Sequence, residues 1–259
     1  HPSPITERRL AFIVAYDGSD WSGSQRQNNS PSVQGELERA LGIVLKHETT
    51  VALAGRTDAG VHATGQVGMF ATVNRIPAER VAMALNRVLE PSVRVRESRD
   101  LTDEELAQRW HPRFSATSRM YRYWIDNAPC ANPLLRKVAG HVRSQLDLEL
   151  MRAATKPFIG ERDFAAWQSA GSNLRGTVRE VKRIEVRETE TFGSVLIEVE
   201  IEANAFLYGM ARNIVGALVE AGRGDIGPEE IERMTLGLDR KQCPPPAPPQ
   251  GLCLTQVKY

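Results

Sequence analysis

The first hundred residues alternate between apolar runs and helical repeats. Short apolar runs bounded by polar and turn residues predict strands at 10–16, 50–53, 66–70 and 93–95. Between them, apolar residues recur at helical spacing. The first helical face consists of Val33, Leu37, Leu41, Val44 and Leu45, and the second of Val81, Leu85, Val88 and Leu89. The predicted order is strand, helix, strand, strand, helix, strand.

Helix starts are marked by residues that suit the first turn. Ser30 and Pro31 resemble an N-cap followed by a proline at the first helical position. Pro77 opens the second helix in the same way, and Asp147 is expected to cap a helix in the second half of the chain. That later helix has Leu150, Met151 and Phe158 among its apolar positions.

The second half repeats the order of elements. Strands are predicted at 118–125, 181–186, 195–201 and 252–257, and helices at 147–158, 205–221 and 228–238. In the third of these strands Ile197, Val199 and Ile201 alternate with glutamates, which is typical of a half-buried strand. Five prolines between 244 and 249 predict a stiff connecting loop before the last strand.

Two successive units of this kind predict an α+β fold made of two ferredoxin-like halves with largely antiparallel sheets. The boundary is expected near residues 101–110, which gives domains at 1–105 and 106–259. The repeat is one of element order, since the two halves share no sequence repeat.

Composition limits the kinds of protein that this chain can be. The 259 residues are 41% hydrophobic and carry a formal charge of only +1, so any nucleic-acid binding must depend on local patches. Arginine outnumbers lysine by 27 to 6, which suits phosphate contacts but is equally common as a result of genomic base composition.

Three widely spaced cysteines and five histidines define neither a disulfide framework nor a metal site. No apolar run has the length of a membrane span, and no secretory signal is recognisable. The expectation is a soluble cytoplasmic protein.

Residues 54–63 hold the most informative stretch, Ala-Gly-Arg-Thr-Asp-Ala-Gly-Val-His-Ala. Asp58 lies between Gly55 and Gly60, with Arg56 before it and His62 after it. No second carboxylate lies within nine residues on either side, which argues against a paired acid–base site within this loop. Flanking glycines allow a large molecule to approach the backbone. By local pattern alone, an ordinary Asp-Ala-Gly turn between two strands is the favoured interpretation.

Arg212 is the second candidate for chemistry. It lies in a segment that is apolar almost all round and is therefore expected to be buried. A buried guanidinium needs a carboxylate partner or access to a cleft. A structural salt bridge and a pairing with Asp58 both satisfy that need, and the second would keep Asp58 ionised and oriented.

Tyr121 lies on a predicted strand with Tyr123 on the same side and Arg122 on the other. Tyrosines in such positions are usually core residues, whereas a functional one would stack on a base. The segment from Arg109 to Arg122 also contains His111, Arg113 and Arg119 and no acidic residue. Basic residues interleaved with aromatics are typical of an RNA-facing surface, although a solvated strand edge has the same pattern.

These segments together resemble the tRNA pseudouridine synthase A family across nearly the whole chain. The matching motifs are Tyr16-Asp17-Gly18, Gln25-Arg26-Gln27, Val33-Gln34-Gly35-Glu36-Leu37-Glu38, residues 55–63, Phe114-Ser115-Ala116, Tyr121-Arg122-Tyr123, Asn204-Ala205-Phe206, Arg212-Asn213-Ile214-Val215-Gly216 and Gly251-Leu252. The chain departs from the family at Ser24, where Trp is usual, and at Cys253, where Tyr is common.

The resemblance implies a pseudouridine synthase fold with a central active-site cleft between the halves. It implies isomerisation of uridines at positions 38, 39 and 40 of the tRNA anticodon stem-loop, without cofactor or metal, by a homodimer in which one tRNA contacts both subunits. The implied catalytic residues are Asp58, Tyr121 and Arg212. The implied RNA-binding residues are Arg56, Leu252, Gln25, Arg26, His62, Arg113 and Arg119.

Three alternatives remain open at this point. A uridine isomerase acting on another RNA has the same motifs, and a non-catalytic RNA-binding module has the same scaffold. A carboxylate hydrolase is a third class, but it usually needs a second carboxylate or a metal, and no motif supplies a partner for Asp58.

Overall fold

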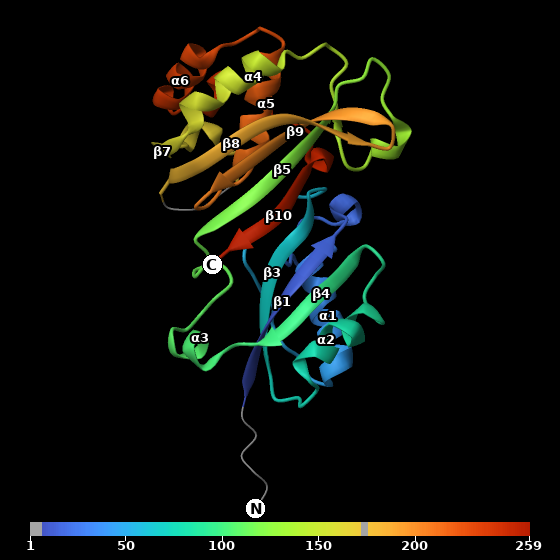
Figure 1. The fold of residues 1–259 in the computed structure, drawn as a ribbon. Helices are drawn as coiled ribbons and strands as arrows, with labels where there is room; N and C mark the ends of the chain where they lie inside the picture. The colour runs from blue at the N-terminus through green and yellow to red at the C-terminus, as the bar shows by residue number, and fades with distance from the viewer. Residues whose placement is uncertain (1–6, 172–175) are drawn as a thin grey trace, which may run out of the picture. The chain divides into compact units, whose positions relative to one another are not determined.

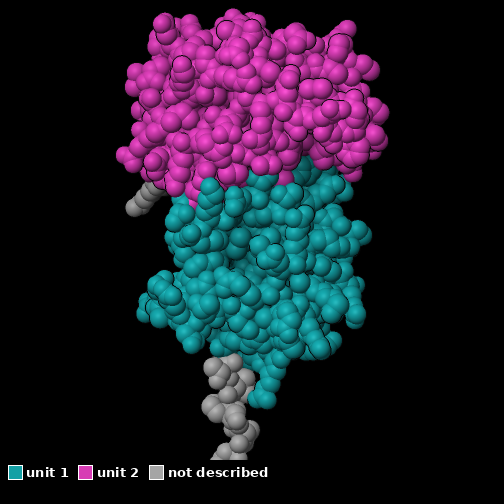
Figure 2. All heavy atoms as spheres, in the orientation of Figure 1, with its two compact units in different colours: residues 1–117, 254–259 teal, residues 118–253 magenta. Residues whose placement is uncertain are grey.

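The computed structural model describes residues 7–171 and 176–259 (Figure 1). The chain forms two compact units (Figure 2). Unit 1 contains the chain up to Thr117 together with Leu254–Tyr259, and unit 2 contains Ser118–Cys253. Both combine helices with mainly antiparallel strands, which confirms the predicted α+β class.

Unit 1 follows the predicted order of elements up to residue 100, and a short helix that was not predicted comes next. These are β1 (Arg8–Tyr16), α1 (Val33–Leu45), β2 (Ala52–Leu53), β3 (His62–Thr72), α2 (Ala78–Asn86), β4 (Val93–Asp100) and α3 (Asp103–Ala107). The sheet order is β4-β1-β3 with β2 on the far side of β3, and every pairing among these four is antiparallel. This is the strand order 4-1-3-2 expected of a ferredoxin-like unit. β10 (Leu252–Lys258), whose residues from Leu254 belong to unit 1, is also a neighbour of β3.

The start of α1 differs from the prediction. Ser32 is the N-cap, and its side chain accepts a hydrogen bond from Gly35 N at 3.1 Å. Ser30 instead forms an isolated bridge with Gln27, and the carbonyl of Pro31 accepts a bond from Ser22 N. The prediction that Ser30 and Pro31 begin the helix was therefore wrong, because both lie in the loop that leads to it.

The segment that follows α3 packs onto unit 1. Trp110 is buried with Ala11 and Leu101, and its ring lies 4.9 Å from that of Tyr259. The first compact unit therefore extends to Thr117, whereas the domain boundary predicted from the sequence lies between residues 105 and 106. The division into two domains, 1–105 and 106–259, stays a prediction.

Unit 2 has its own set of paired strands. Its elements are β5 (Ser118–Asp126), β6 (Gly140–His141), α4 (Leu148–Thr155), β7 (Gly160–Asp163), β8 (Val178–Thr191), β9 (Ser194–Ala203), α5 (Met210–Gly222) and α6 (Pro228–Gly237). The order is β5-β9-β8-β7, all antiparallel, with the short β6 parallel to β5. α4 packs against α5 and β8 (Figure 1).

Two helices of unit 2 differ from their predicted bounds. α5 begins at Met210 rather than Ala205, because Gly209 caps it with a φ of +70°, a backbone conformation that breaks the helical path. α4 begins after its Asp147 cap as predicted but ends at Thr155. Phe158 is buried from a following turn, whereas Leu150 is largely exposed rather than part of the apolar face.

The expectation of a half-buried strand at β9 was wrong, because both of its sides are buried. Glu198, Glu200 and Glu202 are each at most 8% exposed. Arginines from neighbouring strands cover them: Arg122 Nε lies 2.6 Å from Glu200 Oε2 and Arg183 Nη2 lies 2.8 Å from Glu200 Oε1. Burial would raise the pKa of Glu200, but the arginines outweigh it and hold that pKa below its usual value.

The proline-rich connector lies directly against α5. A Cβ at Gly216 would be 2.1 Å from the carbonyl oxygen of Pro245, so only glycine allows this approach. Backbone bonds join the two segments, because Ala247 N donates to Arg212 O at 2.9 Å. The connector is therefore a fitted part of unit 2.

We expect Gly216→Ala to lower the free energy of unfolding by about 1–3 kcal/mol, because the connector must move to admit the methyl group. Urea unfolding followed by circular dichroism measures this change. Gly42→Ala on α1 is the matched control, since a Cβ there meets nothing within 4 Å and alanine favours helix. Equal stabilities for the two variants would contradict the close approach.

Candidate active site

Asp58 lies at the start of a tight turn in unit 1. Val61 N donates to Asp58 O at 3.1 Å, and Gly60 has a φ of +81°. A positive φ at the third residue is what a type II turn requires, which explains the glycine. The Asp-Ala-Gly turn between β2 and β3 that the local pattern favours is thus present, and it carries the carboxylate of Asp58.

The residue before Asp58 is fixed by three hydrogen bonds. Thr57 N donates to Ser24 Oγ at 2.8 Å, and Ser24 N donates to Thr57 O at 3.0 Å. The hydroxyls of Tyr16 and Thr57 are 2.7 Å apart. Ser24 is 1% exposed, so these bonds are shielded from water. The backbone that carries Asp58 is therefore held from its N-terminal side.

Gln66 and Gly18 brace the loop further. Gln66, a fully buried amide on β3, donates to Gly55 O at 2.8 Å and accepts from Gly55 N at 3.2 Å. On the other side a Cβ at Gly18 would be 1.9 Å from Val61 O, so glycine is required for this contact. Contacts at both ends therefore fix the turn before any substrate binds. A catalytic side chain needs such a fixed backbone to be held in position.

His62, predicted to bind RNA, is 7% exposed and serves the same loop. Gly18 N donates to His62 Nδ1 at 2.9 Å. Asp17 Oδ1 lies 3.3 Å from the same nitrogen and also accepts from Ser19 N at 3.0 Å. An RNA contact of His62 stays a prediction.

Ser24 offers a direct test of this bracing. Ser24→Ala removes the acceptor for Thr57 N, and we expect a loss of roughly 5–30-fold in kcat from a barrier increase of about 1–2 kcal/mol. The measurement is turnover of tRNA together with the melting temperature. Ser22→Ala, which removes one hydroxyl oxygen two residues away, is the control. Unchanged kcat in Ser24→Ala would show that the bond to Thr57 does not position Asp58.

Arg212 lies in the first turn of α5 in unit 2 and is half-buried. Its Nε donates to Ala247 O at 2.8 Å, and Tyr123 OH donates to the next carbonyl, Pro248 O, also at 2.8 Å. Burial raises the pKa of the Tyr123 phenol above its usual value, and the nearby charge of Arg212 offsets only part of that rise. Arg212 thus anchors the connector through Nε, and this contact fixes the direction of its guanidinium.

Tyr121 and Leu252 also belong to unit 2, and both are buried. The Tyr121 ring meets that of Phe206 edge to face, with centroids 4.8 Å apart. The segment that ends the connector, with Gly251, packs against Tyr123: a Cβ at Gly251 would lie 2.3 Å from its ring. The backbone just before Leu252 is therefore held in place by the packing of Gly251 on Tyr123.

The remaining RNA-binding candidates have varied surroundings. Gln25 and Arg26 are exposed, and Arg26 pairs with Glu38 at 2.7 Å. Arg119 donates to Asn204 O at 2.7 Å in unit 2. Arg113 in unit 1 lies over the ring of Phe114. Their contacts with RNA stay predictions.

The structure therefore gathers the site residues into two groups. Arg56 and Asp58 share one loop of unit 1, where Arg56 is exposed and Asp58 partly so, and His62 begins β3 after that loop. Tyr121, Arg212 and Leu252 belong to unit 2.

No site role was predicted for the residues that hold the Asp58 loop, namely Ser24, Tyr16, Gln66 and Gly18. Tyr16 and Gly18 stood out only as parts of a matching motif. Ser24 drew notice only as a departure from the family. A usable signal was available in Gln66, because an amide inside an apolar strand must find hydrogen-bonding partners.

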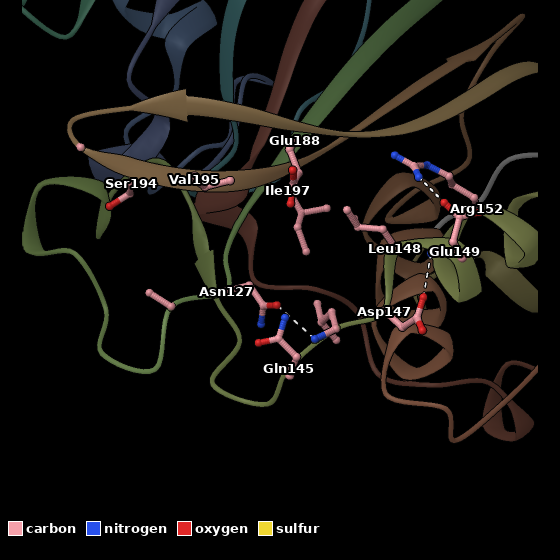
Figure 3. Close-up of a pocket in the computed structure, with 13 residues that line it drawn as sticks. Asn127, Gln145, Asp147, Leu148, Glu149, Arg152, Glu188, Ser194, Val195 and Ile197 are labelled. Carbon is pink, nitrogen blue, oxygen red and sulfur yellow. Dashed lines mark hydrogen bonds and ion pairs between the residues drawn. The ribbon is translucent and has the colours of Figure 1, made fainter.

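A hollow of about 670 Å³ lies elsewhere in unit 2, between the start of α4 and the β8–β9 hairpin (Figure 3). Asn127, Asp147, Glu149, Glu188 and Val195 are among its lining residues, and Figure 3 shows Asp147 and Glu149 on the α4 side. None of the predicted site residues lines it. Within residues 7–171 and 176–259, no three His, Cys, Asp or Glu side chains are grouped to hold a metal ion.

Comparison with known proteins places this chain in a class. A family model described as tRNA pseudouridine synthase matches residues 12–114 and 154–259, which include Asp58, Arg212 and Leu252. The chain belongs to the tRNA pseudouridine synthase family.

Within that family the chain is similar to tRNA pseudouridine synthase A. The protein of that name from Geobacter sulfurreducens is 38% identical over 252 residues, 97% of this chain and 100% of that protein. The one from Syntrophotalea carbinolica is 40% identical over 250 residues, 96% of each chain. These matches confirm the resemblance found in the motifs. A crystal structure of a Cbf5-Nop10-Gar1 complex matches at a TM-score of 0.37 and 15% identity, covering 95% of this chain and 49% of that chain, which is too distant to inform the fold or the site.

Proposed function

We propose that this protein isomerises uridine to pseudouridine at positions 38, 39 and 40 of the tRNA anticodon stem-loop. The observation that carries the proposal is the carboxylate of Asp58 on a turn that is braced at both ends. The full-length similarity to proteins named tRNA pseudouridine synthase A supports tRNA as the substrate.

The proposed reaction exchanges one glycosidic bond for another. The bond from C1′ to N1 of uracil breaks, the base rotates, and C1′ bonds to C5. The hydrogen of C5 leaves and N1 gains one, so substrate and product have equal mass and oxidation state. A stacked uridine is inaccessible to a side chain, so the nucleotide must first be flipped out.

Each candidate residue has a proposed role in this sequence. Asp58 attacks the ribose or the base, or removes a ribose proton. Arg56, exposed on the same loop, fills the vacated space in the RNA or holds its backbone. Tyr121 stacks on the uracil and accepts the C5 proton, and Leu252 packs against the base. Arg212 is proposed to keep Asp58 ionised when substrate is bound.

The proposed RNA contacts are those of Gln25, Arg26, His62, Arg113 and Arg119. The proposed assembly is a homodimer in which one tRNA contacts both subunits, acting in the cytoplasm. Among the described residues, no helix is long and apolar enough to cross a membrane.

Tritium release from tRNA labelled at C5 of uracil tests the proposal. Formation of the bond to C5 must expel that hydrogen, whereas the mass of the RNA hides the reaction. Release from tRNA supports the proposed function, and tRNAs with uridine at only one of positions 38, 39 and 40 identify the targets. Release only from ribosomal RNA fragments would point to another substrate. No release from any RNA would leave a binding module.

A further inference from the structure

Phe114 is a large apolar side chain held in contact with solvent. It is 78% exposed, although Trp110, four residues earlier in the chain, is only 8% exposed. A ring exposed to this degree contributes little to the apolar core, and most of its surface is accessible to a ligand.

The turn that carries Phe114 is firmly anchored. Ser115 N donates to His111 O and His111 N donates to Ser115 Oγ, each at 2.9 Å. Tyr259 OH donates to Pro112 O at 2.8 Å, and the Tyr259 ring packs on buried Trp110. The ring of Phe114 is thus presented by a fixed backbone, so little conformational freedom is lost when a ligand binds it.

Positive charge and a second ring accompany Phe114. The guanidinium carbon of Arg113 lies 5.7 Å from the centroid of the Phe114 ring, and the His111 ring centroid lies 4.6 Å away at an interplanar angle of 33°. Arg113 N donates to His111 Nδ1 at 3.1 Å. Burial and the charge of Arg113 lower the pKa of His111, so the imidazole is neutral near pH 7 and Arg113 supplies the charge.

The chemistry of this arrangement fits an unpaired nucleobase. A base offers a flat aromatic face to the Phe114 ring, and the phosphate beside it offers a negative charge to Arg113. No acidic residue lies in the sequence between Glu105 and Asp126, so this stretch does not itself repel a phosphate.

We propose that Phe114, flanked by His111 and Arg113, is a stacking platform for an unpaired base of the bound RNA. This inference rests on the proposed function for the identity of that RNA, tRNA. It adds a recognition point outside the Asp58 loop, where the residue contacts RNA without touching the reacting atoms.

Binding of a tRNA transcript to four variants tests the platform. Phe114→Ala and Phe114→Leu are expected to weaken binding about tenfold, because leucine keeps the apolar surface but loses the flat ring. Phe114→Tyr and Phe114→Trp are expected to bind within about twofold of the wild type, since both can stack. Phe192→Ala is the matched control: Phe192 is 67% exposed at the tip of the β8–β9 hairpin in unit 2.

Fluorescence provides a readout that does not depend on turnover. The added tryptophan of Phe114→Trp is expected to be quenched by an unstructured oligoribonucleotide and by tRNA, beyond any quenching in the wild type, and not by the same oligonucleotide in a duplex. Wild-type affinity in Phe114→Leu, or no added quenching, would overturn the platform. Loss of tritium release with intact quenching would instead contradict only the proposed reaction.

Discussion

Replacing Asp58 with alanine is expected to abolish tritium release from C5-labelled tRNA while tRNA binding persists. Asp58 is the carboxylate of the loop that the site is built around, and the neighbouring residues bond the backbone rather than supply a second acid. Loss of the side chain that performs the proposed attack or proton removal is expected to cost roughly 10⁴-fold or more in turnover. Binding is spread over many phosphate contacts, so it survives the change.

The measurement pairs tritium release with filter binding of the same tRNA. Asp58→Asn keeps the size of the side chain and separates loss of charge from loss of shape. Asp103→Ala, at an exposed carboxylate in the first turn of α3, controls for loss of a negative charge in unit 1. Turnover by Asp58→Ala at the wild-type rate would remove Asp58 from the mechanism.

Arg212→Lys is expected to lower kcat by roughly 10²-fold, as for loss of a positioned electrostatic group. The guanidinium donates through Nε to Ala247 O at 2.8 Å, and its planar fork carries two terminal nitrogens besides Nε. Lysine carries a single ammonium, which cannot hold the connector and orient a carboxylate at once. The loss is therefore expected in kcat rather than in the affinity for tRNA.

Single-turnover rates with saturating enzyme separate the chemical step from binding. Arg223→Lys, at the other end of α5 where Arg223 pairs with Glu220, is the matched control. The melting temperature reports on the connector, because Arg212→Lys also disturbs its anchor. A variant with a lowered melting temperature but a wild-type rate would reduce Arg212 to a packing role.

The elements of this fold follow from local patterns, but their exact starts do not. Apolar runs and helical spacing predict most strands and helices of both units, since these signals depend on near neighbours in the chain, but the short α3, β6 and β7 were not predicted. The start of α5 was missed because residues 205–208 are as apolar as the helix itself. Gly209 alone interrupts it, and one glycine in an apolar run is a weak signal.

Long-range partners limit what the sequence can reveal. The glutamates of β9 predict a solvent-facing side, but arginines from β5 and β8 cover them. The same holds for the site: the motif points to Asp58, whereas Ser24, which holds Thr57, stands 33 residues earlier in the chain. The partners in such polar pairs are far apart in the sequence and meet only in the folded protein, so residue spacing does not predict them.

The path of the chain has a consequence for biosynthesis. Unit 1 needs Leu254–Tyr259, whose strand β10 lies beside β3 so closely that a Cβ at Gly65 would be 2.1 Å from Thr255 O. The ribosome makes this segment only after all of unit 2. During translation the part of β3 that pairs with β10 therefore lacks this partner while some 136 residues, Ser118–Cys253, are synthesised. Nascent chains halted before Leu254 lack a segment of the unit that bears Asp58, so that unit is completed only after unit 2 has been synthesised.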